Sequence, residues 1–476
     1  MKKAVLSALA ATIVTSAVYA DTMTLFTDPK TGQVFTTPGD GRIEMGDFID
    51  AKSVDMSLRD TESKAAEYQD KMDKYVSKDK KNWSNKVKIG GYMQFRDTNW
   101  FDGANTQDID TAKSGLQKFT GYWADKSTND NSNFFIRRAR LILSGDVGDH
   151  LGIYIQPDFG SQPAGASNGN FGQLRDFYGD INIDKEKVHR VRVGQSKVPY
   201  GFENMQSSSK RLTLDRNDAF NSAVKDERDI GAFYYYTPVA IQELFKEIDD
   251  MGLKSTGNYG MFALGAYNGQ GANNTEKSEN NHIVSRFTYP FKTASGQIFE
   301  FGIQGYAGKY VVNPTATATG TASGQFPSQE AAKLGVKDER IGITGIMYQQ
   351  PFGIQAEWTW GKTPGADDKT TNKVSEKSLE GGYIQTMYRL TNVLKEGDVL
   401  TPFVKWQYFD GYQKAEKNAP YNQVNDWEIG AEWQMAKEVE LTGVIHKMNR
   451  TDLGQLNGYG ERFEGTAFRV QAQINY

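Results

Sequence analysis

The chain has 476 residues, with 12% aromatic residues, 48 glycines, no cysteine and a net charge of −4. The mild excess of acid argues against a nucleic-acid partner, and the lack of cysteine excludes disulfides and thiolate chemistry. After the N-terminus, no apolar run approaches the ~18–20 residues that a membrane-spanning helix needs.

The N-terminus has the layout of an export signal. Lys2 and Lys3 precede a short apolar run that ends at Val18-Tyr19-Ala20, a small-x-Ala cleavage pattern. We therefore predict a secretory signal peptide over residues 1–20. The alternative, an N-terminal membrane anchor, is disfavoured because the apolar run is short. Residues 21–48 would then form a periplasmic N-terminal segment.

Residues 49–85 carry the pattern of a coiled coil. Apolar or small residues recur at alternating spacings of four and three, with charged residues between them: Val54, Leu58, Thr61, Ala65, Tyr68, Met72 and Tyr75. This a/d seam predicts a coiled-coil helix that joins protomers. The alternative is a single surface helix, because Thr61 and Ala65 make the seam weak.

From residue 86 onward the hydrophobic pattern has a period of two. In the last eleven residues, for example, Phe468, Val470 and Ile474 share one face while Arg469 and Gln471 lie on the other. Such alternation predicts strands with one apolar and one polar face. We predict sixteen of them, at 86–97, 134–147, 151–159, 174–183, 189–197, 230–237, 259–268, 282–289, 298–310, 339–349, 352–362, 379–389, 399–410, 425–435, 439–448 and 466–476.

These strands predict a transmembrane antiparallel β-barrel over residues 86–476. Each is near the ~9–11 residues that a tilted strand needs to cross a bilayer. The links alternate between long and short, except for a long link at 238–258 that includes a predicted amphipathic helix at 243–250. A soluble β-sandwich also alternates, but Trp358, Trp360 and Trp427 near strand ends fit interfacial girdles. The all-β membrane barrel is therefore the favoured fold class.

The stretch FFIRRARLILSG, residues 134–145, places three arginines inside an apolar run. If Ala139, Leu141 and Leu143 face lipid, Arg138 and Arg140 point into the lumen. Arg137 is expected near the strand end, where it can reach an interface.

Five motifs resemble the phosphate-selective porin family, porins O and P. They are RRARL at 137–141, RVGQSKVPYG at 192–201, LTLDRNDAF at 212–220, DERDIG at 226–231 and a closing QINY at 473–476. The resemblance implies a sixteen-stranded barrel in the outer membrane of a Gram-negative bacterium, commonly a homotrimer. It also implies a loop folded into the lumen, here 199–229, and a C-terminal strand that the outer-membrane assembly machinery recognises through Tyr476.

The resemblance further implies that arginines and lysines guide small anions such as phosphate. The residues carried over as pore-lining and anion-binding are Arg138, Arg140, Arg192, Lys197, Arg211, Arg216 and Arg228. Two features oppose strong selectivity: acids match the basic residues of the loop in number, and alternation puts Glu357, Glu428, Glu432 and Glu440 on the lumen face. For Arg138 and Arg140, the alternative to anion guidance is ion pairing with loop acids such as Asp215 or Glu227.

No catalytic, cofactor or metal site is predicted. The four histidines, at 150, 189, 282 and 446, have no serine, aspartate or metal-ligand partner at motif spacing. The favoured function is a passive porin for phosphate-like anions, and the alternative is a general diffusion porin with weak selectivity. A barrel enzyme would need a nucleophile–histidine pair that the sequence does not offer.

Overall fold

The structure is a computed structural model that describes residues 22–49, 63–64, 66–74, 86–108, 133–161, 171–312, 334–366, 374–416, 419–452 and 461–476. The chain divides into two compact units, residues 1–85 and 86–476. The predicted signal peptide lies outside the described residues.

The N-terminal unit contains a small antiparallel sheet that the sequence analysis did not predict. Strand β1 (Thr22–Thr27) lies between β2 (Val34–Phe35) and β3 (Ile43–Ile49). Within the predicted coiled-coil segment, residues 63–64 and 66–74 are helical, and the seam residues Tyr68 and Met72 are exposed. The pairing of this helix with another protomer stays a prediction.

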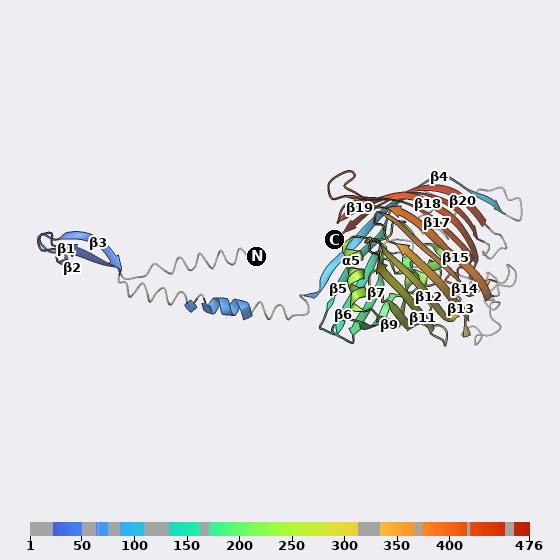
Figure 1. Cartoon of the computed structure of the whole chain (residues 1–476), viewed down its shortest axis with the longest axis horizontal. Coiled ribbons are helices and arrows are strands. Elements are labelled where there is room, and N and C mark those ends of the chain that lie inside the picture. Colours follow the sequence, from blue (N-terminus) through green and yellow to red (C-terminus); the bar gives the residue numbers. More distant parts are fainter. Residues whose placement is uncertain are drawn as a thin grey trace. The chain divides into compact units, whose positions relative to one another are not determined.

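The C-terminal unit is a closed antiparallel barrel (Figure 1). Its strands are β4 (Lys88–Asp108), β5 (Asn133–Asp146), β6 (Leu151–Ser161), β7 (Phe171–Asn182), β8 (His189–Lys197), β9 (Arg228–Tyr236), β10 (Phe262–Tyr267), β11 (His282–Lys292), β12 (Ile298–Tyr310), β13 (Val336–Met347), β14 (Phe352–Ala366), β15 (Val374–Tyr388), β16 (Leu390–Thr391), β17 (Val399–Tyr412), β18 (Tyr421–Ala436), β19 (Val439–Asp452) and β20 (Glu461–Asn475). The two-residue β16 follows β15 directly and pairs with the same neighbour, β17, so the barrel has sixteen walls.

The predicted fold class is confirmed, and each predicted strand corresponds to one wall. The bounds of β8 and β12 match the prediction, while several other strands extend further at one end. The predicted helix within the 238–258 link is also present, as α5 (Val239–Asp250). Among the described residues, no helix is both long enough and apolar enough to cross a membrane.

Alternation along each strand sorts side chains between lipid and lumen. In β11, Ile283 and Phe287 are exposed on the outer face, while Val284 and Arg286, which lie between them in the sequence, are buried. Aromatic rings gather on the outside, where Trp358, Trp406 and Tyr408 stack on one another. The outer surface is thus apolar and the interior polar, as a membrane barrel requires.

The link between β8 and β9 folds into the barrel interior and carries nearly half of the residues of the site described below. It contains α3 (Phe202–Met205), α4 (Asp218–Asn221) and the 3₁₀ helix η3 (Lys225–Glu227). Its first turn needs Gly201, whose φ is +81° and where an added Cβ would lie 2.6 Å from the Phe220 ring. Tyr200 and Phe220 pack against Tyr306 and Phe409 of the wall. We call residues 198–227 the lumen loop.

Candidate functional site: an arginine-lined cavity in the lumen

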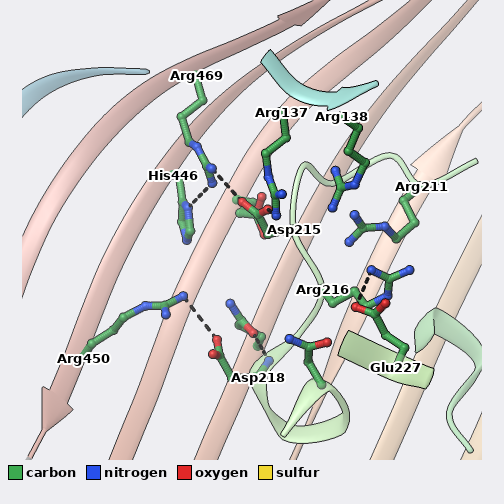
Figure 2. A pocket seen from close by; sticks show the side chains of 13 residues that line it. Arg137, Arg138, Arg211, Asp215, Arg216, Asp218, Glu227, His446, Arg450 and Arg469 are labelled. Carbon is green, nitrogen blue, oxygen red and sulfur yellow. Dashed lines mark hydrogen bonds and ion pairs between the residues drawn. The ribbon is translucent and has the colours of Figure 1, made fainter. Parts of the chain in front are cut away.

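A cavity of about 120 Å³ lies between the lumen loop and one side of the barrel wall (Figure 2). The cavity is lined by six arginines, four carboxylates, one histidine and two amides: Arg137, Arg138, Arg211, Arg216, Arg450, Arg469, Asp215, Asp218, Glu227, Glu428, His446, Asn221 and Gln407. The loop supplies six of these residues, and β5, β17, β18, β19 and β20 supply the rest. With His446 neutral, the lining carries an excess of two positive charges.

A β-bulge in β5 turns Arg137 into the lumen. Gln94 on β4 faces Arg138, but the next residue, Phe95, faces Ile136, so Arg137 has no partner in the register. A bulge changes the side-chain alternation locally and re-aims a side chain. The expectation that Arg137 reaches an interface is therefore wrong, because Arg137 and Arg138 both face the cavity.

Asp215 of the lumen loop is bound by three arginines of the wall. Its carboxylate lies 2.6 Å from Arg469 Nη2, 3.1 Å from Arg96 Nη1 and 3.8 Å from Arg137 Nη2. Arg96 also donates to the Leu214 carbonyl at 2.9 Å. This cluster holds the loop against β4, β5 and β20 and neutralises part of the basic wall.

Glu227 forms the second arginine cluster, at the end of the lumen loop. Its carboxylate lies 2.6 Å from Arg228 Nη1, 2.8 Å from Arg216 Nη1 and 3.4 Å from Arg175 Nη2. Burial alone raises the pKa of the Glu227 carboxyl, but the three guanidiniums hold it well below its usual value. Glu227 therefore stays charged and compensates arginines that would otherwise be buried unpaired.

Arg138 and Arg211 differ from these paired arginines. Arg138 donates from Nη1 to Gln94 at 2.7 Å, and Arg211 donates from Nη2 to the Leu214 carbonyl at 3.2 Å. Neither contacts a carboxylate of the described residues. The Nε of Arg138 and the Nε and Nη1 of Arg211 are buried without a hydrogen-bond partner. Two guanidiniums with unused donors therefore face one cavity (Figure 2).

Apart from Arg216, the other predicted anion-binding residues do not line the cavity, and they make internal contacts. Arg140 donates to Asp158 at 2.7 Å and to the Tyr92 hydroxyl at 2.6 Å. Arg192 forms a two-pronged pair with Asp180, and Arg228 binds Asp176 besides Glu227. Lys197 donates to the Met205 and Gln206 carbonyls. These contacts stabilise the wall and the entry of the lumen loop.

The lumen-facing glutamates do not form an acidic wall opposite the arginines. Glu357 accepts from the backbone N–H groups of Phe202 and Glu203 at the start of α3, so it anchors the loop. Glu432 pairs with Lys254, and Glu440 accepts from Asn475. Of the four, Glu428 lines the cavity. Three of these glutamates therefore bind groups elsewhere in the lumen and do not face the arginines of the cavity.

The acids named in the alternative for Arg138 and Arg140 are not the partners observed. Asp215 and Glu227 bind other arginines, and Arg140 pairs with Asp158 on the neighbouring strand. The places of Arg137, Arg450 and Arg469 in the cavity were not predicted from the sequence. The alternation of the last strand had placed Arg469 on the polar face, which was a usable signal, whereas no sequence signal marks the bulge at Arg137.

A model of the phosphate-selective porin O and P family matches residues 112–476. The chain belongs to this family. The porin therefore resides in the outer membrane of a Gram-negative bacterium, and its family and barrel point to a channel rather than an enzyme.

Solved structures similar to this porin include three outer-membrane proteins. The channel DcaP of Acinetobacter baumannii is 15% identical, with a TM-score of 0.45 over 82% of this chain and 97% of that chain. An anion-selective porin from Comamonas acidovorans is 12% identical (TM-score 0.44, 82% and 99% coverage). Salmonella typhi OmpF, solved with daunomycin, is 11% identical (TM-score 0.47, 82% and 97% coverage). A search of curated proteins finds no match.

Proposed function

We propose that this outer-membrane channel conducts small anions, phosphate-like ones in particular, and that a passing anion contacts Arg138 and Arg211. The observation that carries the proposal is the pair of guanidiniums with unused donors and no carboxylate partner at one cavity. Guanidinium N–H groups match the oxygens of phosphate in geometry and charge. In a narrow, low-dielectric lumen this attraction exceeds its value in bulk water.

The paired arginines support conduction rather than tight binding. A channel needs a site that attracts an ion but also releases it. In this lumen, Asp215 and Glu227 already neutralise much of the surrounding positive charge. An anion at Arg138 and Arg211 would therefore meet a moderate excess of positive charge, from which it can leave. Arg140, Arg192, Lys197, Arg216 and Arg228 would act by holding these two guanidiniums and the loop in place.

The zero-current potential of the purified porin in a planar bilayer, under a potassium chloride gradient, tests this proposal. We expect an anion preference and a chloride current that added phosphate reduces. Arg138→Gln and Arg211→Gln should each lower the anion-to-cation permeability ratio about fivefold, the equivalent of ~1 kcal/mol for one charge at 4 Å in water.

Arg190→Gln is the matched control. It also removes one positive charge from the lumen face, but Arg190 pairs with Asp180 and lies outside the cavity. Equal effects of Arg190→Gln and Arg138→Gln would mean that total lumen charge, and not this site, sets selectivity.

A general diffusion porin with weak selectivity is the second candidate. The observation that favours it is that four of the six arginines lining the cavity, Arg137, Arg216, Arg450 and Arg469, already contact carboxylates. It predicts a zero-current potential near zero and a current that ignores phosphate.

The motif resemblance also supports a homotrimer as the assembled form of this porin. Sizing of the detergent-solubilised protein, with and without residues 49–85, would test both the trimer and the contribution of the predicted coiled coil. A monomer in both samples would contradict the proposal.

A further inference from the structure

The link between β9 and β10, residues 237–261, is far longer than is needed to join two neighbouring strands. The two strands are neighbours in the barrel, with Tyr236 paired to Phe262, and the other described links at this end of the barrel are short. This link instead contains α5 and the segment that follows it. We call residues 237–261 the strap.

The strap reaches the opposite wall of the barrel. Lys254 Nζ lies 2.5 Å from the Glu432 carboxylate on β18, and both side chains are largely buried. In the barrel order, six walls separate β18 from β10 on one side and seven separate it from β9 on the other. Because Glu432 lies near the end of β18 that precedes the short turn to β19, the strap crosses the mouth of the barrel at the short-turn end.

The strap and the lumen loop share one apolar core. Phe245 and Ile248 of α5 pack with Phe202 of the loop and with Ile298 and Tyr348 of the wall. Polar contacts add to this core: Lys210 pairs with Asp249 at 2.5 Å, and the Gln206 amide donates to the Lys254 carbonyl at 2.9 Å. The strap therefore lies directly against the loop that carries Arg211 and Arg216.

The two ends of the strap are held differently. On the near side, Asn258 receives hydrogen bonds from Arg190 and Thr237, and Glu247 pairs with Lys292 of β11. On the far side, the described contact with the wall is the pair of Lys254 with Glu432, and Glu440 on β19 interacts electrostatically with both residues. This ion pair is the described link of the strap to the far wall, while Leu253 in the shared core and the Gln206–Lys254 hydrogen bond hold the strap to the lumen loop. Breaking the pair therefore releases the strap from the far wall alone.

We propose that the strap is a second constriction of the channel, which limits the size of solutes that leave at the short-turn end, and that Lys254 and Glu432 are its latch. With the latch closed, the strap divides the mouth and narrows the exit. With the latch broken, the far end leaves the wall and the exit widens. The proposed constriction acts on solutes of any charge. A test of it therefore does not depend on the anion preference proposed above.

A cleavable cross-link tests the latch in the assembled channel. The chain has no cysteine of its own, so Lys254→Cys combined with Glu432→Cys can be joined by a short bis-maleimide that contains a disulfide. We expect the joined channel to keep the wild-type single-channel conductance. Reductant added during the recording should then raise the conductance about twofold and let larger neutral sugars enter proteoliposomes.

The matched control joins Glu247→Cys to Lys292→Cys, the ion pair at the fixed side of the strap, where cleavage should leave conductance and sugar entry unchanged. Heat-modifiable gel mobility identifies folded barrels in every sample. The charge swap Lys254→Glu with Glu432→Lys gives a second, linker-free measurement and should restore wild-type sugar entry, whereas Glu432→Lys alone should increase it. Unchanged conductance and sugar entry after cleavage at the Lys254–Glu432 pair would overturn the proposal.

Discussion

The lumen holds two groups of arginines that differ in their neighbours. Arg140 and Arg192 each pair with a carboxylate on the adjacent strand, and Arg228 pairs with Asp176 on β7, two strands away. Within the described part of the chain, Arg138 contacts an amide and Arg211 a carbonyl, neither contacts a carboxylate, and both retain buried N–H groups without partners. The comparison separates arginines that an acid already neutralises from two that no described carboxylate contacts. Under the proposed function, the number of arginines alone therefore does not measure anion affinity.

The largest effect is expected from Glu227→Gln, which removes the acid that Arg175, Arg216 and Arg228 share. Arg175, Arg216 and Arg228 would then be buried around a neutral amide. Breaking a buried ion pair in this way costs about 3–5 kcal/mol. The urea midpoint of unfolding, followed by heat-modifiable mobility, measures the loss. Glu428→Gln is the control, because Glu428 Oε2 has no hydrogen-bond partner to lose. Equal midpoints for the two variants would contradict this account.

A smaller effect, on selectivity, should follow from Asp215→Asn. The substitution removes the negative charge that Arg96, Arg137 and Arg469 share, and the last two of these arginines line the cavity. We expect the anion-to-cation permeability ratio from zero-current potentials to rise several-fold. Asp158→Asn frees Arg140 outside the cavity and should change the ratio less. A ratio that falls, or that rises equally in both variants, would refute the distinction between the two groups.

The smallest effect is a pH dependence that comes from Asp218 in the lumen loop. Burial raises the pKa of its carboxyl to about 6; Asp426 adds to this shift, while Arg450, His446 and Lys405 oppose it. Because a raised pKa favours the neutral acid as pH falls through 6, the cavity loses one negative charge on acidification. The anion preference should therefore increase about twofold between pH 7.5 and pH 5. Asp218→Asn should abolish the change, and a change that persists would contradict its assignment to Asp218.

The sequence predicted the barrel well because its signal is repeated along the whole chain. The alternation of each strand is read independently, so an error in one strand does not affect the next. For β8 and β12, the predicted first and last residues match those in the structure. The small sheet of β1–β3 was missed because its strands are short and mostly exposed, which leaves little alternation to recognise.

The site was predicted less well because it depends on contacts between distant residues. Alternation correctly directed Arg138 and Arg140 inward, but it gave no information on which acid each would meet. Asp158, the partner of Arg140, lies on the next strand, and the pairing depends on barrel register. The inward turn of Arg137 depends on a bulge of a single residue, and nothing in the residue types around it distinguishes that position.

The contacts of Asp215 have a consequence for the order of assembly. Its three arginines come from β4 and β5, the first two strands of the barrel, and from β20, the last. β20 and β4 form the seam that closes the barrel, where Tyr476 also exchanges backbone hydrogen bonds with Gly91. The carboxylate therefore acquires its full set of partners only when the ring has closed around the loop. A chain that stops before β20 lacks the seam and Arg469 together, so the cavity is completed in the same step as the barrel.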